Sequence, residues 1–346
     1  MLRRLVRTAQ VAVQQRTHRL TTLPIVILYL NDICNSRCLT CAIWQNNERL
    51  KRPELRQMSD ELLEALYEQM TLWSPAEVLL SGGEPTMHPR FADVVGRLRA
   101  MAIRVQVVTN GLSLPGFRAA ELQGISEFFI SFDAPDTESY TTIRGVDGFT
   151  RMGNGVRFVR SILPSVPITA RCTLQRDNVG RLPELVGAAR SLGFGRISFL
   201  AVDTRTDAFG RNHPDHAVVA ERITPRALDL EAMAAGIRTL ERSGAATFVE
   251  SGTARLRSIH RYFLAVLGRA EFPPVACNAP WVSAVIETSG NLRGCFFHEV
   301  IGDFRDPNAR SAVEFRSALR VQDNPTCRQC VCSKNLGPRG VWSLGS

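Results

Sequence analysis

The chain has 346 residues, 45% of them hydrophobic and 22% charged, and a formal net charge of +9 at pH 7. This composition is that of a globular protein and excludes a disordered or fibrous chain. Much of the excess positive charge lies in residues 1–22, which hold five arginines and no acid. Because no basic stripe interleaved with aromatic residues follows, we expect no nucleic-acid partner.

Residues 1–22 predict a basic amphipathic helix. Its apolar stripe, which the arginines oppose, consists of Leu2, Leu5, Val6, Ala9 and Val13. Such a helix commonly packs on its own domain; the alternative is contact with a membrane surface that presents a lipid-linked substrate. The apolar run 23–30 is too short to span a bilayer and has no signal cleavage site, so we expect a cytoplasmic protein.

Strand-type and helix-type segments alternate after residue 22, which predicts parallel βα units. The expected strands are Ile25–Leu30, Glu77–Ser81, Arg104–Thr109, Glu127–Phe132, Ile168–Leu174 and Arg196–Val202. The expected helices are Asp60–Met70, Arg90–Met101, Gly116–Leu122, Met152–Leu163 and Leu182–Leu192. Because the units are too few for a closed eightfold barrel, we expect an open partial barrel or a doubly wound sheet.

The chain changes character after these units. Residues 203–221 predict a polar loop, 225–242 and 253–267 predict helices, and Ser289–Asn291 predicts the turn of a hairpin. The expected domains are an N-terminal helix (1–22), an α/β barrel (23–215), a helical connector (216–270) and a small C-terminal domain (271–346).

The nine cysteines fall into a group of three, a single residue and a group of five. In a reducing compartment this clustering indicates metal or redox chemistry rather than disulfides. Cys34, Cys38 and Cys41 follow the first strand, at the sheet edge where α/β folds bind ligands. Three thiolates can hold three corners of a [4Fe–4S] cube and leave the fourth iron for another ligand. Zinc is the alternative, but a closed zinc site needs a fourth ligand, and none lies nearby.

A second motif, Gly82-Gly83-Glu84-Pro85, follows the second strand. The glycines let a ligand approach the backbone, Glu84 offers a carboxylate to an ammonium group, and Pro85 stiffens the turn. Alone, this stretch would be a simple turn; beside the three cysteines it indicates a cofactor site.

Together the two motifs resemble the radical S-adenosylmethionine (SAM) superfamily over residues 23–215. The resemblance implies a partial (β/α)6 barrel and a [4Fe–4S] cluster whose open iron binds SAM. One electron, supplied by a reductant protein such as flavodoxin or ferredoxin, cleaves SAM, and the 5′-deoxyadenosyl radical removes hydrogen from a substrate. The chain departs from the family at Thr40, where an aromatic residue usually precedes the third cysteine, and Trp44 is the predicted substitute.

The resemblance also implies SAM contacts at the ends of later strands, namely Asn110, Ser131, Asp133 and Arg171. Arg171 shares one face of its strand with Thr169 and Thr173, and would pair with the SAM carboxylate if that face is inward. The alternatives are a plain turn for Asn110 and a pairing with a neighbouring acid for Arg171.

The C-terminal group comprises Cys277, Cys295, Cys327, Cys330 and Cys332. A zinc ribbon is one explanation. The stretch from Cys277 through Pro280-Trp281 to "GNLRGCFF" instead resembles the SPASM/Twitch appendage of radical SAM enzymes, which carries auxiliary [4Fe–4S] clusters. Full SPASM domains need more cysteines than remain here, so one cluster is expected. Its expected ligands are Cys277, Cys295, Cys327 and Cys330, with Cys332 either spare or the ligand in place of Cys330.

The isolated Cys172 is expected to be a buried apolar residue on the outer face of its strand. The alternative is a thiol that donates hydrogen to a substrate radical, as in radical SAM epimerases.

These features predict a radical SAM enzyme that acts on a small molecule such as a sugar, a cyclitol or a lipid-linked precursor. A small molecule is favoured because no domain precedes the barrel to bind a leader peptide and because the appendage is reduced. A net oxidation is favoured because a closed auxiliary cluster offers an electron acceptor. The alternatives are epimerisation, carbon–carbon bond formation, peptide maturation with a separate recognition protein, and an iron–sulfur electron carrier without enzyme activity.

Overall fold

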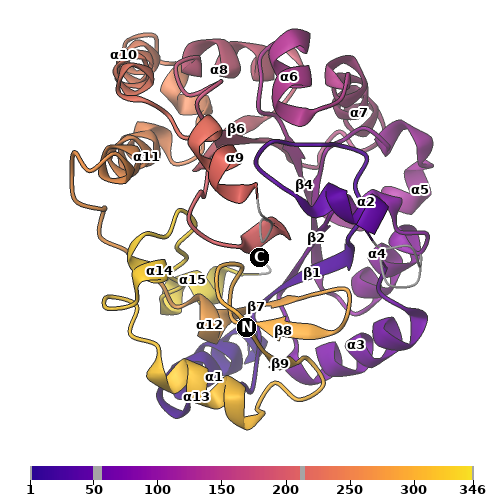
Figure 1. Ribbon diagram of the computed structural model, residues 1–346. Helices are drawn as coiled ribbons and strands as arrows, with labels where there is room; N and C mark the ends of the chain where they lie inside the picture. The colour runs from indigo at the N-terminus through magenta and orange to yellow at the C-terminus, as the bar shows by residue number, and fades with distance from the viewer. Residues whose placement is uncertain (1, 50–56, 211–214, 345–346) are drawn as a thin grey trace.

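The computed structural model describes residues 2–49, 57–210 and 215–344. They form one sheet of nine strands in the order β6-β5-β4-β3-β2-β1-β7-β8-β9, surrounded by helices (Figure 1). The strands are β1 (Ile25–Asn31), β2 (Glu77–Gly82), β3 (Arg104–Thr109), β4 (Ile125–Ser131), β5 (Ile168–Leu174), β6 (Arg196–Ala201), β7 (Ser283–Ile286), β8 (Asn291–Arg293) and β9 (Val300–Asp303). Strands β1 to β7 pair in parallel, whereas β8 and β9 are antiparallel additions. The sheet has two edges, β6 and β9, so the predicted open partial barrel is confirmed.

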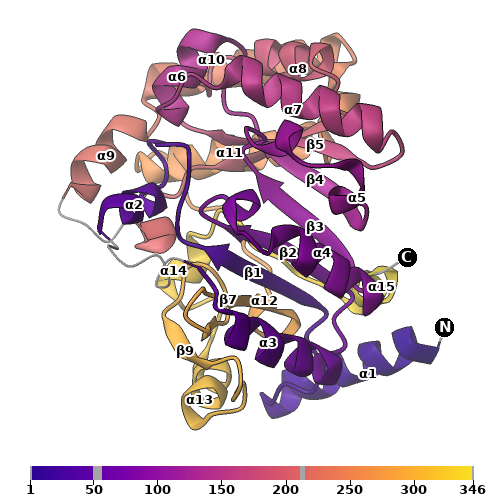
Figure 2. The same ribbon diagram turned by 90° about the vertical axis from the view of Figure 1, so that its right-hand side faces the viewer.

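Helices α3 to α8 follow the strands and cover the outer face of the sheet (Figures 1 and 2). The helices are α1 (Leu2–Thr17), α2 (Asn46–Arg49), α3 (Asp60–Trp73), α4 (Phe91–Ala100), α5 (Ala119–Leu122), α6 (Thr137–Arg144), α7 (Phe149–Ile162), α8 (Leu182–Ser191), α9 (His216–Ile223), α10 (Ala227–Arg242), α11 (Gly252–Val266), α12 (Ala279–Val282), α13 (Arg310–Ala318), α14 (Pro325–Arg328) and α15 (Pro338–Ser343). Short 3-10 turns are η1 (Ile43–Gln45), η3 (Pro85–Met87), η4 (Leu114–Gly116), η5 (Ala208–Gly210) and η6 (Ala245–Phe248).

The alternation of strand side chains divides the sheet into two faces. Val26 and Leu28 of β1 belong to the main buried core beneath the outer helices, and both are fully buried. Ile27 and Tyr29 belong instead to a second cluster inside the barrel, which also contains Cys41. The polar and cysteine-bearing side chains therefore occupy the concave side of the sheet.

All six predicted strands are present, with ends shifted by at most two residues. The helices that were not predicted are α2, α6, α9, α12, α13, α14 and α15, and two of them bear on the site. Helix α6 begins at the N-cap Asp136 and ends at Gly145, both of which are ordinary helix boundary signals. The predicted polar loop 203–221 is wrong for the residues in α9, because Ile223 is buried against the core and stabilises a helix there. Residues 211–214 of that loop lie outside the described residues.

The predicted C-terminal hairpin is confirmed by the antiparallel pairing of β7 and β8. The sequence did not indicate that β7 also pairs in parallel with β1, from Ile25↔Ser283 to Leu28↔Ile286. The C-terminal segment thus extends the barrel sheet on the side of β1. The predicted domain boundaries stay a prediction.

Helix α1 packs on α12 and α15. Val11 and Gln14 are buried, and Gln14 Nε2 donates a hydrogen bond to the carbonyl of Thr22 at 3.0 Å. The predicted apolar stripe is mostly on the other face, where Leu2 and Leu5 are exposed. Packing on the protein's own fold therefore uses a face that the stripe did not identify.

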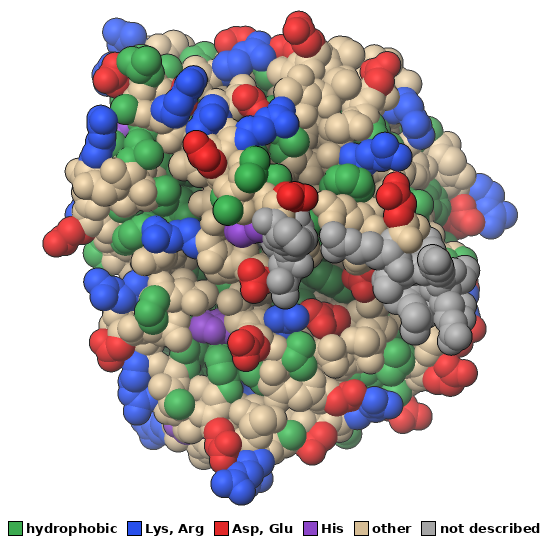
Figure 3. Space-filling model, in the orientation of Figure 1, with side chains coloured by type: hydrophobic (Ala, Val, Ile, Leu, Met, Phe, Trp, Pro, Cys, Tyr) green, Lys and Arg blue, Asp and Glu red, His purple; other side chains and the backbone are tan. Residues whose placement is uncertain are grey.

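Acidic and basic side chains are interspersed over the face shown in Figure 3. This pattern agrees with the balanced charge of residues 23–346. Among the described residues, no helix is both long enough and apolar enough to cross a bilayer.

Candidate functional site

The first cysteine loop leaves β1 and is held by the end of α6. The backbone N–H of Arg37 donates to the carbonyl of Arg144 at 2.8 Å, and that of Leu39 donates to Ile143 at 3.0 Å. Gly145 ends α6 with φ +68°, and a Cβ at this position would lie 2.4 Å from the carbonyl oxygen of Arg37. The helix that the sequence did not predict is therefore the support of the cysteine loop.

The two sequence motifs meet through backbone hydrogen bonds. The N–H of Gly83 donates to Asn31, and the N–H of Glu84 donates to Ile33, each at 2.8 Å. The side chain of Asn31 returns a hydrogen bond to the carbonyl of Glu84 at 2.9 Å. A Cβ on Gly83 would lie 2.0 Å from the carbonyl oxygen of Ile33, so only glycine permits this approach. The glycine thus brings the two loops together, in addition to any ligand contact.

The Glu84 carboxylate accepts four hydrogen bonds from its own chain. One oxygen accepts from Thr86 N, Thr86 Oγ1 and Thr109 Oγ1, and the other accepts from Asn110 N at 2.7 Å. Burial raises the pKa of Glu84, and these hydrogen bonds oppose the rise. The side chain is 1% exposed. The Glu84 side chain thus connects the end of β2 to the end of β3. The predicted hydrogen bond from the ammonium group of SAM to Glu84 stays a prediction.

Asn110 connects the end of β3 to the first cysteine. Its Nδ2 donates to Asn35 Oδ1 at 2.6 Å and to Ser36 Oγ at 3.2 Å, and lies 3.9 Å from Cys34 Sγ. The backbone N–H of Ser36 also points at this sulfur, at 3.4 Å. Asn110 therefore acts on the cysteine loop itself and is more than a turn residue.

Asp133 and Arg144 form a buried ion pair of 2.9 Å behind the cysteine loop. The second oxygen of Asp133 accepts the N–H of Thr173 at 2.7 Å. Burial acts to lower the pKa of Arg144, but the nearby Cys38 and Asp133 raise it well above its usual value. Its buried Nε has no hydrogen-bond partner among the residues that the structure describes. No sequence pattern indicated Arg144, and the predicted contact of Asp133 with SAM stays a prediction.

The remaining predicted residues lie on β4 and β5. Ser131 pairs with Arg171 across the sheet, and the Arg171 guanidinium lies over the ring of Phe129, 4.7 Å from its centroid. Burial lowers the pKa of Arg171, while Glu250 and Cys332 act to raise it. Its side chain therefore faces the barrel interior, which is the condition for the predicted pairing with the SAM carboxylate; the pairing itself stays a prediction. Cys172 is fully buried in the outer core, as predicted.

The donor set of the first loop fits an iron–sulfur cluster. Burial raises the pKa of Cys34 to about 12 and that of Cys38 to about 11, and neighbouring thiolates add to both shifts. A metal that binds thiolates must therefore displace their protons. The orphaned, positively charged Arg144 Nε beside Cys38 fits an anionic group that the chain does not itself provide. Cys34, Cys38 and Cys41 would hold this group.

The five C-terminal cysteines all line one cavity of about 210 Å³. Its other walls include Ile25 and Leu79 from the inner face of the sheet and Phe297 from the hairpin. The cavity is smaller than a usual small-molecule pocket, for which roughly 300–1,000 Å³ is typical. A compact group held by thiols fits it better than an organic ligand.

Three of the thiols that line this cavity accept hydrogen bonds from backbone N–H groups at the same sequence separation. The N–H of Ala279 points at Cys277 Sγ at 3.5 Å, and that of Cys332 points at Cys330 Sγ at 3.3 Å. Burial raises the pKa of Cys295 to about 11, and hydrogen bonds from the backbone of Phe297 and His298 oppose this. In Cys277, Cys295 and Cys330, as in Cys34, the sulfur thus accepts a hydrogen bond from the backbone N–H of the residue two positions later. This geometry agrees with the predicted role of Cys330 as a ligand, and the choice between Cys330 and Cys332 stays a prediction.

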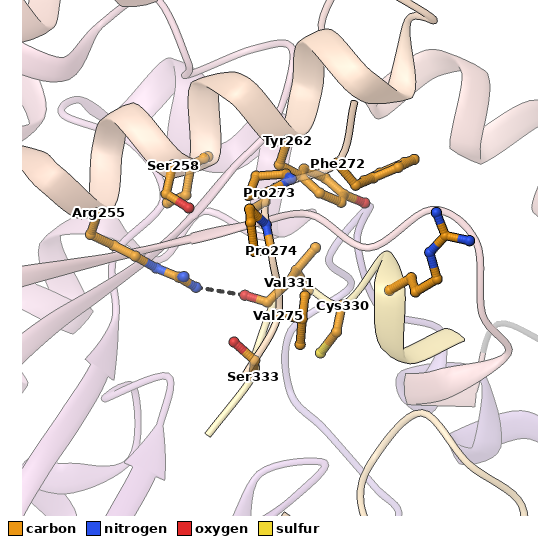
Figure 4. Close-up of a pocket in the computed structure, with 13 residues that line it drawn as sticks. Arg255, Ser258, Tyr262, Phe272, Pro273, Pro274, Val275, Cys330, Val331 and Ser333 are labelled. Atoms are coloured by element: carbon orange, nitrogen blue, oxygen red, sulfur yellow. Dashed lines mark hydrogen bonds between the residues drawn. The ribbon is translucent and has the colours of Figure 1, made fainter. Parts of the chain in front are cut away.

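Cys330 also borders a smaller pocket between α11 and the C-terminal segment (Figure 4). In this pocket Arg255 donates a hydrogen bond of 2.6 Å to the carbonyl of Val331. Tyr262 and Phe272 lie beside it, with their ring centroids 5.7 Å apart. The arginine therefore fixes the short segment that carries Cys330 and Cys332 to the helical part of the fold.

An aromatic cluster links the two cysteine groups. The ring centroids of Tyr29 and Phe209 lie 6.1 Å and 5.4 Å from that of Phe296. The Cys41 thiol donates a 3.6 Å hydrogen bond to the carbonyl of Phe209, while Phe296 lines the cavity of the second group. One aromatic cluster on the concave side of the sheet therefore contacts Cys41 of the first group and also lines the cavity of the second group.

Within the residues that the structure describes, no three His, Cys, Asp or Glu side chains converge as ligands of a single metal ion.

Trp44, the predicted cover of the cysteine loop, lies in η1 with the Arg37 guanidinium 6.0 Å from its ring centroid.

Residues 28–171 match the radical SAM superfamily, and this range contains both motifs, the last four residues of β1 and all of β2, β3 and β4. Residues 28–171 are a radical SAM domain. The domain implies the predicted [4Fe–4S] cluster and SAM, and the five cysteines beyond it fit an auxiliary-cluster domain of the SPASM/Twitch type.

Three similar proteins show the range of this likeness. The PqqA peptide cyclase of Gluconobacter oxydans is 28% identical over 180 residues, which are 51% of this chain and 49% of that protein. Streptococcus suis SuiB bound to precursor peptide SuiA has a TM-score of 0.62 at 14% identity, covering 97% of this chain and 74% of SuiB. The anSMEcpe enzyme with bound AdoMet and Cp18Cys peptide has a TM-score of 0.59 at 14% identity, covering 88% and 87%. At these identities the two structures establish the fold, and this chain spans about half the length of the curated relatives it matches.

The prediction of a small-molecule substrate is wrong. One relative is named as a peptide cyclase, and the two structures contain a bound peptide. The prediction relied on the lack of a leading recognition domain and on a reduced appendage. Neither feature excludes a peptide, because a separate protein can supply recognition.

Proposed function

We propose that this chain is a radical SAM enzyme that removes hydrogen from a carbon of a peptide substrate. The observation that carries the proposal is that one aromatic cluster, on the concave side of the barrel sheet, contacts the first cysteine group and lines the cavity of the second. The likeness to SuiB over 97% of this chain supports a substrate of the same class.

The residues at the first site have distinct tasks. Cys34, Cys38 and Cys41 hold the cluster, and the α6 contacts fix their loop. Gly82, Gly83, Pro85, Ser131 and Arg171 are proposed to surround SAM at the carboxyl edge of the sheet. Glu84 and Asn110 fix the geometry between the SAM loop and Cys34. When bound, the first cluster supplies the electron that cleaves SAM, and the second offers an acceptor for an electron from the substrate.

The second site is proposed to hold one auxiliary [4Fe–4S] cluster through Cys277, Cys295, Cys327 and Cys330. An internal electron acceptor supports a net oxidation of the peptide, in which two hydrogens are lost. Cysteine-bound clusters of this kind persist in a reducing compartment, so the cytoplasm is the proposed location. The electron for SAM cleavage is proposed to come from a flavodoxin or ferredoxin.

The test follows the origin of the hydrogen in 5′-deoxyadenosine. Anaerobically reconstituted protein would receive SAM, dithionite and a peptide pool prepared by digesting fully deuterated protein. We expect deuterium in 5′-deoxyadenosine and its loss in the Cys34→Ala, Cys38→Ala, Cys41→Ala triple variant. Deuterium transfer from deuterated sugars and cyclitols, with none from the peptide pool, would contradict the proposal.

A further inference from the structure

Among the four proposed auxiliary ligands, Cys327 has a different kind of hydrogen-bond donor. Cys277, Cys295 and Cys330 receive backbone N–H groups from residues two positions later. Cys327 instead lies 3.3 Å from Nε2 of His298, which is 29 positions earlier in the chain. This donor is a side chain, so a single substitution can remove it without changing the backbone.

His298 is aimed at Cys327 by contacts on two sides. Its ring lies edge-on to Phe315 of α13, with centroids 5.1 Å apart and planes at 66°. Its carbonyl accepts a hydrogen bond of 2.7 Å from Arg293, which also pairs with Glu287 at 2.5 Å. The imidazole is therefore packed in place by the hairpin and by α13, and it lines the same cavity as the five cysteines.

The chemistry of a bound thiolate decides the direction of this hydrogen bond. A metal-bound cysteine has lost its proton and can only accept, so Nε2 of His298 carries the hydrogen. A reduced cluster has one more negative charge than an oxidised one. A donor at a ligand sulfur stabilises the reduced form more and so raises the reduction potential.

We propose that His298 is a positioning residue of the auxiliary cluster, which donates a hydrogen bond to the Cys327 thiolate and raises the reduction potential of that cluster. This inference rests on the proposed cluster site, whose presence is measured separately in the test. A higher potential makes the auxiliary cluster a better electron acceptor than it would be without this hydrogen bond.

The test uses the full chain in a background that lacks the first cluster, with Cys34, Cys38 and Cys41 replaced by Ala. Each sample is first assayed for iron and then titrated potentiometrically while EPR follows reduction. The variants are His298→Ala, which removes the donor, and His298→Gln, which supplies an amide N–H. His260→Ala is the matched control, because His260 lies in α11 and its Nε2 is 3.2 Å from the carbonyl of Leu230.

We expect His298→Ala to keep its iron and to titrate at a lower potential, His298→Gln to recover most of the shift, and His260→Ala to be unchanged. Retained iron with an unchanged potential in His298→Ala would overturn the role of His298 and leave the cluster site intact. The background protein that retains His298 would also be labelled with nitrogen-15 histidine and studied by pulsed EPR. A strong coupling of the imidazole nitrogen to the cluster would overturn the role of His298 as a hydrogen-bond donor, because His298 would then be a ligand. A background protein without iron would instead contradict the proposed cluster site.

Discussion

The two cysteine groups of this chain differ in how they are assembled. The first lies on one loop between Cys34 and Cys41, directly after β1. The second is collected from three segments: the residues just before α12, the connection between β8 and β9, and the stretch from α14 to Cys332. A local site needs little ordering of distant chain, whereas a dispersed site exists only when long loops close. The first group could therefore be identified from the spacing of its cysteines in the sequence, whereas the second group forms only when the whole fold forms.

The supports of the two groups differ as well. The first loop is fixed by hydrogen bonds to α6 and to the Gly83 loop. The second group depends on the pairing of β7 with β1 and on single side chains such as Arg255 and His298. The comparison teaches that motif recognition finds ligands, while the residues that orient them come from elsewhere in the fold.

The largest expected effect is on metal content. Reconstituted protein should hold about eight irons per chain, with about four in each cubane cluster. Replacing Cys34, Cys38 and Cys41 with Ala should leave about four irons and abolish SAM cleavage. Replacing Cys277 and Cys295 with Ala should also leave about four irons while SAM cleavage continues. Iron assay and chromatography of 5′-deoxyadenosine measure both effects. Zinc in the native protein would refute the assignment of one iron–sulfur cluster to each cysteine group.

The next prediction separates the two candidate ligands at the C-terminal segment. Cys330→Ala should lose the auxiliary cluster, whereas Cys332→Ala should keep it, because Cys330 shares the N–H donor geometry of Cys34 and Cys277. Iron content and the EPR signal of the second cluster distinguish the two variants. Loss of the cluster in Cys332→Ala alone would reverse the assignment.

A smaller effect concerns the junction of the two sequence motifs. Gly83→Ala should lower the free energy of unfolding by ~1–3 kcal/mol, because its Cβ would lie 2.0 Å from a carbonyl oxygen. Gly187→Ala is the control: it lies in α8 with no atom within 4 Å of the added Cβ, and should stabilise by ~0.5–1 kcal/mol. Denaturant unfolding of the apoprotein measures both, and equal values would show that the Gly83 loop can move.

The smallest effect concerns α6, which supports the first loop. Asp136 accepts hydrogen bonds from Ser139 N and from Arg181, and the N–H bond above all lowers its pKa to about 2. Because the folded pKa is below the unfolded value of about 3.9, its stabilisation is complete above that pH and is lost as the pH falls towards about 2. Asp136→Ala should cost ~1 kcal/mol at pH 7, as for other N-caps.

The pH series supplies the check on this prediction. The difference between Asp136→Ala and the unmodified protein should shrink between about pH 4 and pH 2. Glu138→Gln in the same helix should change stability by less than ~0.5 kcal/mol. A difference that is constant with pH would mean that the Asp136 carboxylate charge does not contribute.

Much of the fold was predictable because strands and helices have their own periodicities. The six barrel strands were found from apolar runs, and Cys172 was correctly placed on the outer face by alternation. Helix α6 was missed because it is short, although Asp136 and Gly145 mark its ends. Arg144 was missed for the same reason, since its task beside Cys38 appears only when α6 lies against the loop. The substrate class was wrong because no residue pattern in the barrel encodes it.

The sequence by itself determined the two motifs of the radical SAM domain, the first cysteine loop and the open parallel sheet, since these follow from local spacing and from side-chain alternation. Only the tertiary structure decided that β7 extends the sheet beside β1, that five distant cysteines share one cavity, and that Glu84, Asp133 and His298 serve other residues of the chain. The physical reason is that hydrogen-bond partners and closed loops depend on contacts between segments far apart in sequence, which no local pattern records.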